Sequence, residues 1–208
     1  MLKIRTIFWD FDGVILDSMP IRDYGFVKIF EDFDKNLVDK LLEYHTKNGG
    51  LSRYVKIRYF YNELLGQVVS DEKVQELADK FSTIMRAELT NKKYLIAQTV
   101  EFIEKNYKNY NFHIVSGSDE KELNYLCDEL GLRIYFKTIE GSPTHKNDLV
   151  KNILKKFSYH PKECVLIGDS INDYEAANIN GMKFYGYNNE KLREVSDKYI
   201  EKENSINI

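Results

Sequence analysis

Two short acidic motifs in this 208-residue chain place carboxylates and glycine directly after apolar runs. Asp10 and Asp12 follow the first apolar run, and Gly13 permits a sharp turn behind them. Asp169 and Asp173 follow a later apolar run in the same way. The carboxyl ends of parallel strands share one edge of a sheet, so the four carboxylates can converge there. Such a hard, oxygen-rich site prefers Mg²⁺ together with a substrate phosphate.

A third polar motif supplies groups that suit an anion. Ser116, Gly117 and Ser118 follow another apolar run, and we expect them to open a helix whose hydroxyl and backbone N–H groups can bind phosphate. Lys146, predicted at the start of a later helix, adds a mobile positive charge. Each feature also has a simpler structural interpretation. The serines could be helix caps, Lys146 could be a solvated residue at a helix end, and the acidic motifs could be surface turns. Their common position at predicted strand ends favours the phosphate site.

The composition excludes several classes of protein. Hydrophobic residues make up 43% and charged residues 30% of the chain, as in globular proteins, and the formal net charge of -3 gives no attraction to nucleic acid or an anionic membrane. Cys127 and Cys164 stand in no CxxC spacing, which argues against a zinc site or a disulfide framework. We find no signal-peptide or membrane-spanning pattern and expect a cytoplasmic monomer or homodimer.

The order of the elements predicts an α/β fold. Strands alternating with helices favour a Rossmann-like parallel sheet with helices on both faces. Residues 18–92 carry only helical patterns, and this segment is too long for a simple crossover. We therefore predict a core domain of residues 1–17 and 93–208, with residues 18–92 inserted as a helical module. The later strands are predicted at residues 112–115, 134–136, 164–167 and 182–185.

With these motifs in this order, the chain resembles the haloacid dehalogenase superfamily of phosphohydrolases. The matching residues are Asp10-Phe11-Asp12-Gly13-Val14, Ser116, Lys146 and Gly168-Asp169-Ser170-Ile171-Asn172-Asp173. The resemblance extends from residue 7 to about residue 181. It implies a HAD-like core and a helical cap domain at residues 18–92 that closes over the site.

The resemblance implies a role for each acidic residue. Asp10 would be the nucleophile that forms an aspartyl-phosphate, and Asp12 would be the general acid and then the base. Mg²⁺ would be held by Asp10, the backbone carbonyl of Asp12 and Asp169. Asp173 would be a further ligand or would orient the ligands.

The resemblance also implies contacts with substrate. Ser116, Gly117 and Lys146 would bind the nonreacting phosphate oxygens. The segment that ends at Arg53 is similar to the cap loop of the β-phosphoglucomutase and phosphoglycolate phosphatase branch, so Arg53 is a candidate specificity residue; the alternative is a surface arginine. Arg22, a second candidate, occupies the place where the mutase carries a histidine that assists its acid/base residue.

The function implied is a Mg²⁺-dependent phosphatase acting on a small phosphorylated metabolite, a sugar phosphate or a phosphoglycolate-like acid. Arg22 in the place of the histidine, and Gly168 where the mutase has a metal-binding glutamate, favour hydrolysis. The alternatives are a phosphosugar mutase of the β-phosphoglucomutase type and a non-catalytic phosphoryl-binding protein. A binding protein would have no need of the general acid Asp12.

Overall fold

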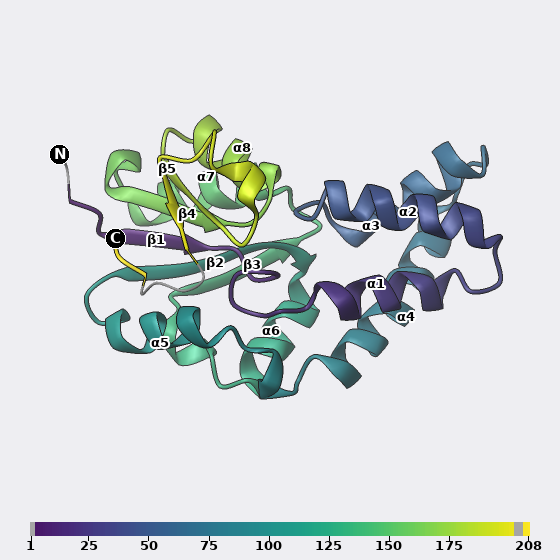
Figure 1. Cartoon of the computed structure of the whole chain (residues 1–208), viewed down its shortest axis with the longest axis horizontal. Helices are drawn as coiled ribbons and strands as arrows, with labels where there is room; N and C mark the ends of the chain where they lie inside the picture. Colours follow the sequence, from purple (N-terminus) through teal and green to yellow (C-terminus); the bar gives the residue numbers. More distant parts are fainter. Residues whose placement is uncertain (1–2, 202–205) are drawn as a thin grey trace.

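The computed structural model describes residues 3–201 and 206–208, and it places a sheet-based core beside a lobe made of helices (Figure 1). Within the described residues, six strands form one parallel sheet in the order β3-β2-β1-β4-β5-β6. The strands are β1 (Thr6–Trp9), β2 (Asn111–Asp119), β3 (Thr138–Ser142), β4 (Cys164–Gly168), β5 (Lys183–Tyr187) and β6 (Lys198–Ile200). The predicted α/β fold is confirmed.

Helices cover both faces of the sheet. Helices α5 (Ala97–Asn106) and α6 (Glu120–Glu129) lie on one face. Helices α7 (Lys146–Phe157) and α8 (Ile171–Ile179) lie on the other (Figure 1). Strand β1 alternates between the two resulting cores: Ile7 and Trp9 are buried in one, and Phe8 is buried in the other. Because both faces are covered, β1 is buried along its whole length, and all its residues but Thr6 are apolar, as is usual in central parallel strands.

Four helices form the lobe, which we call the helical lobe: α1 (Met19–Ile29), α2 (Lys35–Lys47), α3 (Arg53–Tyr59) and α4 (Asp71–Glu88). A π-helical turn, Phe60–Leu64, continues α3. Ser70 caps α4 by accepting a hydrogen bond from the backbone N–H of Lys73. The helical lobe falls within residues 18–92, while the boundaries of the two domains stay a prediction.

One predicted strand is wrong and one observed strand was not predicted. Residues 134–136 are not a strand, because Arg133–Tyr135 is a 3₁₀ turn in which Ile134 is 74% exposed. The neighbouring strand is β3, where Ile139 is the buried apolar side chain. The short outer strand β6 is not predicted at all. Strands at the outer part of a sheet are short and mix polar with apolar residues, so their periodicity is weak.

The prediction that Ser116, Gly117 and Ser118 open a helix is also wrong. Strand β2 continues through them, and α6 begins after Asp119, whose side chain accepts a hydrogen bond from the backbone N–H of Glu122 at 3.0 Å. Aspartate is a strong N-cap residue, so Asp119 caps the helix and α6 begins at Glu120, after the serine motif has ended.

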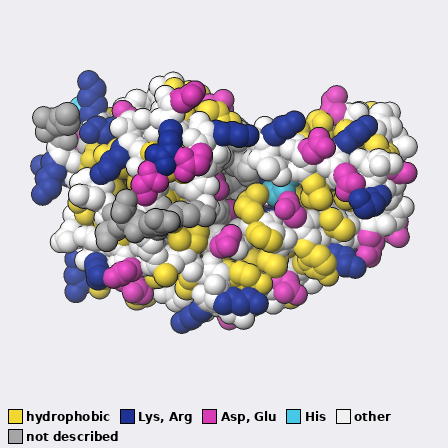
Figure 2. Space-filling model, in the orientation of Figure 1, with side chains coloured by type: hydrophobic (Ala, Val, Ile, Leu, Met, Phe, Trp, Pro, Cys, Tyr) yellow, Lys and Arg dark blue, Asp and Glu magenta, His cyan; other side chains and the backbone are white. Residues whose placement is uncertain are grey.

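The surface agrees with the charge balance. Lys and Arg side chains are interspersed with Asp and Glu on the face shown in Figure 2, where a notch in the outline separates the core from the helical lobe. No helix among the described residues has the length and apolar character needed to span a bilayer. Both cysteines are buried and free, as expected.

Candidate active site

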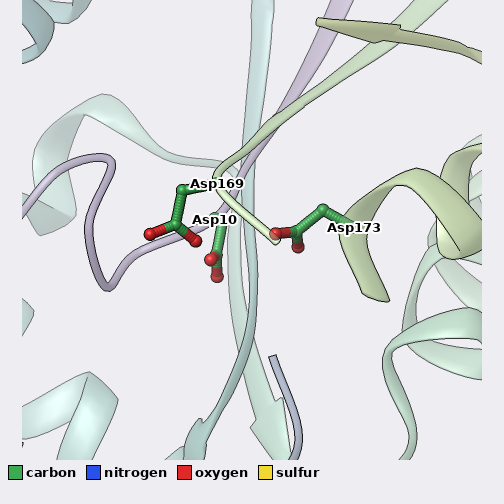
Figure 3. A group of neighbouring side chains, drawn as sticks. All are labelled: Asp10, Asp169 and Asp173. Carbon is green, nitrogen blue, oxygen red and sulfur yellow. The ribbon is translucent and has the colours of Figure 1, made fainter. Parts of the chain in front are cut away.

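Three carboxylates meet at the carboxyl edge of the sheet (Figure 3). Asp10 follows β1, and its backbone N–H donates to the carbonyl of Ile167 at 2.9 Å, which fixes it beside β4. Asp169 follows β4, and Asp173 lies in the first turn of α8. One oxygen from each carboxylate lies within 4.8 Å of the others, and Asp10 is only 3% exposed. The structure thus brings together three of the four carboxylates that the sequence predicts to converge; the prediction is wrong for the Asp12 side chain, which bonds other groups.

Two glycines leave room for these carboxylates. Gly13 has φ of +77°, and a Cβ there would lie 2.0 Å from an Asp169 carboxylate oxygen. A Cβ at Gly168 would lie 2.3 Å from Cβ of Asp173. A larger residue at position 168, such as the mutase's glutamate, is therefore incompatible with Asp173 in this position.

Burial of these carboxylates close together raises the pKa values of Asp10 and Asp169. Burial and the Asp173 carboxylate raise the pKa of Asp10 to about 7, although Lys146 opposes this. Burial and Asp10 raise the pKa of Asp169 well above its ordinary value. Like charges held this close in a buried site need a cation to remain ionised together.

Asp10, Asp169 and Asp173 fit a metal ion. All three donate oxygen ligands, and hard divalent cations such as Mg²⁺ prefer carboxylate oxygens. The side chain of Asp12 lies outside the cluster and bonds other groups. The metal contact that the family resemblance implies for Asp12, through its backbone carbonyl, stays a prediction.

Lys146 already places one positive charge in the acidic cluster. It is the first residue of α7, as predicted, but it is 4% exposed rather than solvated. Its Nζ donates to an Asp10 oxygen at 2.9 Å and to an Asp173 oxygen. Burial acts against the ammonium, but Asp10 and Asp173 outweigh it and raise the pKa of Lys146. Lys146 thus remains charged next to the predicted nucleophile.

Asp12 is held by three donors on the opposite side of the site. Ser118 Oγ donates to one carboxylate oxygen at 2.5 Å; Ser18 Oγ and Arg22 Nε, the latter at 2.6 Å, donate to the other. Burial alone would raise the pKa of Asp12, but Arg22 and the two hydroxyls outweigh burial and lower it. Asp10 and Asp12 therefore have opposite electrostatic environments.

Two of the three predicted phosphate-binding residues, Ser116 and Gly117, line a cavity that Asp10 and Asp12 also line, whereas Lys146 bonds Asp10 and is not part of its lining. Ser116 is 1% exposed, and its Oγ accepts a hydrogen bond from the backbone N–H of Ser118 at 3.1 Å. A Cβ at Gly117 would lie 2.3 Å from the carbonyl oxygen of Gly50, so the cap loop rests directly on this strand end. These groups come from β2 and not from a helix N-terminus.

Both predicted cap residues are buried and joined to the core through one carboxylate. Arg22 Nη1 donates to Glu122 of α6 at 3.2 Å, and Arg53 Nη1 donates to the other oxygen of Glu122 at 2.7 Å. Arg53 also donates to Ser82 Oγ at 2.7 Å and is 4% exposed. The alternative of a surface arginine at position 53 is therefore wrong.

The cavity between core and lobe is closed to a small volume. It measures about 30 Å³ and is lined from the core by Asp10, Asp12 and Ser116, and from the helical lobe by Arg22 and Arg53.

The sequence interpretation assigned no role to two buried charged residues at the site, Glu122 and Lys56. Glu122 stands four residues before the buried Leu126 of α6, and Lys56 stands four residues before the buried Phe60. That spacing puts each charged side chain on the buried face of its helix. A charged residue on an apolar helical face was the available signal.

Comparison with known proteins agrees with this geometry. The model of the family "Haloacid dehalogenase-like hydrolase" matches residues 7–187. A phosphoglycolate phosphatase of Pasteurella multocida is 24% identical over 202 residues, which cover 90% of this chain and 89% of that protein.

Two solved structures show the same fold. A β-phosphoglucomutase from Clostridium difficile has a TM-score of 0.77 at 16% identity, covering 95% of this chain and 91% of that chain. A predicted phosphoglycolate phosphatase from Haemophilus somnus has a TM-score of 0.74 at 19% identity, covering 97% and 96%. The matched family model spans most of the sequence and includes every acidic residue of the site. The chain belongs to the family of haloacid dehalogenase-like hydrolases.

Proposed function

We propose that the chain is a Mg²⁺-dependent phosphatase that hydrolyses a small phosphorylated metabolite, a sugar phosphate or a phosphoglycolate-like acid. The observation that carries this proposal is the contrast between Asp10 and Asp12 in one cavity. Asp10 lies in the acidic cluster, and Asp12 lies among hydroxyls and a guanidinium. Two carboxylates with different environments suit the separate roles of nucleophile and acid/base.

Asp10 performs the first step. One of its carboxylate oxygens attacks phosphorus while the bond from phosphorus to the leaving oxygen breaks, and an aspartyl-phosphate forms. Mg²⁺ held by Asp10, Asp169 and Asp173 would offset the repulsion between carboxylate and phosphate. Lys146, 2.9 Å from Asp10, adds a second positive charge for the phosphoryl oxygens.

Asp12 moves the protons. It donates a proton to the leaving oxygen in the first step, and in the second it takes one from the water that attacks phosphorus. Inorganic phosphate leaves and Asp10 is regenerated. Ser18, Arg22 and Ser118 fix the orientation of the Asp12 carboxylate. Arg22 favours the ionised base, and the charge of a bound phosphate favours the protonated acid.

The helical lobe excludes water from this chemistry. Because residues of both the core and the lobe line the cavity, closure of the lobe would leave little room for bulk solvent beside the phosphoryl group. Opening and closing of the lobe then accompany each turnover.

The test is phosphate release from a panel of phosphorylated metabolites, with and without Mg²⁺, by the wild type and Asp10→Asn side by side. We expect release that requires Mg²⁺ and is lost in the variant. Release that is independent of Mg²⁺, or that survives in Asp10→Asn, would refute the proposal. Interconversion of sugar phosphates without net release would identify a mutase instead.

A further inference from the structure

Lys56, on α3 of the helical lobe, is a buried cation without an acidic partner. It is 2% exposed, and its Nζ donates to the carbonyl oxygen of Gly49 at 3.2 Å. Within residues 3–201 and 206–208 it forms no ion pair with a carboxylate. Burial of an unpaired ammonium costs several kcal/mol. A lysine placed in such a position, beside a cavity, is explained if an anionic partner arrives with the ligand.

The neighbouring cations do have acidic partners. Arg22 pairs with Asp12 and Glu122, and Arg53 pairs with Glu122. Asp12 and Glu122 are thus taken up by the two guanidinium groups. The charges of Asp12 and Asp23 reach Lys56 and act to raise its pKa, but neither carboxylate forms a direct ion pair with Nζ: Asp12 bonds Ser18, Arg22 and Ser118, and Asp23 faces His45 at 3.6 Å.

The lobe side of the cavity is also rich in unused donors. Lys56, Arg22 and Arg53 all line the cavity. Nη2 of Arg22 and Nη2 of Arg53 are buried and have no hydrogen-bond partner in the described part of the chain. Buried polar groups in folded proteins are generally hydrogen-bonded, so these donors call for acceptor oxygens. Unpaired guanidinium N–H groups and an ammonium without an ion pair suit an anion better than a neutral hydroxyl.

We propose that Lys56 binds an acidic group of the substrate, a carboxylate or a second phosphate, on the leaving-group side of the phosphoryl ester. This inference rests on the proposed function and narrows its substrate class from phosphorylated metabolites to phosphorylated acids. Burial and then Arg22 lower the pKa of Lys56 to about 7, and an anion bound beside the ammonium would hold it in the charged form.

The test compares three ligands of one scaffold: 2-phosphoglycolate, its neutral amide, and ethylene glycol bisphosphate. Binding is measured by calorimetry with Mg²⁺ in an Asp10→Asn background, so that no ligand is consumed. We expect at least one of the two acidic ligands to bind tenfold tighter than the amide, which equals about 1.4 kcal/mol. The acidic ligand that binds more tightly than the amide shows whether Lys56 binds a carboxylate or a phosphate. Equal affinities for all three would overturn the proposal.

Variants assign the preference to Lys56. Lys56→Met should bring the acid-to-amide affinity ratio close to one, and Lys56→Arg should keep it. Lys47→Met, at an exposed lysine of α2, is the matched control and should keep the ratio. A ratio that survives in Lys56→Met would overturn the proposal.

Stability and turnover separate the remaining explanations. Because Lys56→Met removes an unpaired buried charge, its melting temperature should equal or exceed that of the parent; a fall of several degrees would identify Lys56 as a structural residue and overturn the proposal. Phosphate release by the wild type is measured separately. If the protein prefers acidic ligands but releases no phosphate, the proposed phosphatase function is refuted and the Lys56 site is supported. If it releases phosphate but shows no preference for acidic ligands, the Lys56 proposal is refuted and the phosphatase function is supported.

Discussion

Glu122 should be one of the most sensitive positions for stability in this protein. It is a fully buried carboxylate of the core that bonds two arginines of the helical lobe, and the side chains of Arg22 and Arg53 are only 6% and 2% exposed. Replacement by glutamine keeps the size but leaves two buried guanidinium groups with one carboxylate fewer. Removing one partner of a buried ion pair costs about 3–5 kcal/mol.

We expect Glu122→Gln to lie near the lower end of that range, about 3 kcal/mol, because the amide oxygen can still accept one hydrogen bond. With a urea dependence of about 2–3 kcal/mol per molar, the midpoint of unfolding should fall by roughly 1–1.5 M. Urea titrations followed by circular dichroism measure this directly. Since all three side chains are buried, added salt should change the difference little.

Glu129→Gln provides the control, because Glu129 lies on the same helix α6 but is exposed. Its midpoint should differ from the wild type by no more than surface substitutions do, within about 0.5 kcal/mol. If Glu122→Gln were as mild as Glu129→Gln, the proposed link between core and lobe would contribute nothing to stability, and our account of the closed cap would be wrong.

Three further variants test other parts of the site and the core. Asp12→Asn should lower kcat by about 10²–10⁴-fold, since the amide cannot shuttle the proton; a rate near wild type would remove Asp12 from the mechanism. Gly168→Ala should displace Asp173, because the added Cβ would lie 2.3 Å from that residue, and should weaken Mg²⁺ activation; an unchanged Mg²⁺ titration would contradict this. Burial lowers the pKa of His113 to about 3, so the folded chain binds fewer protons than the unfolded chain below pH 6.5. The His113 contribution to stability is therefore lost as pH falls, by about 1.4 kcal/mol between pH 7.5 and 5.5, and this loss should be absent from His113→Gln in denaturation curves at the two pH values.

The acidic centre was predictable because its residues follow strands. Asp10, Asp12 and Asp169 come directly after apolar runs, and parallel strands bring their carboxyl ends to one edge. The same argument placed Lys146 at the beginning of a helix near the site. Local sequence is sufficient here, since strand ends and helix starts are local features and the topology supplies the rest.

The connection between core and lobe was not predictable in this way. Arg22 and Glu122 are 100 positions apart, and Arg53 and Glu122 are 69 apart. No periodicity relates residues that far apart in the sequence, because their contact depends on how the lobe docks on the core. The serine motif failed for a local reason, since Asp119 competes successfully as the helix cap and keeps Ser116 and Gly117 in the strand.

If Asp10 is the nucleophile, the phosphoryl group is bonded covalently to its carboxylate during turnover. Trapping that aspartyl-phosphate is the most direct test. Asp12→Asn should still accept a phosphoryl group from an aryl phosphate, whose leaving group needs no acid, but should release it slowly for want of a base. After an acid quench during turnover with Mg²⁺, peptide mass spectrometry should find one phosphoryl group on Asp10. Continued phosphate release with no phosphoryl group on that residue would contradict the account.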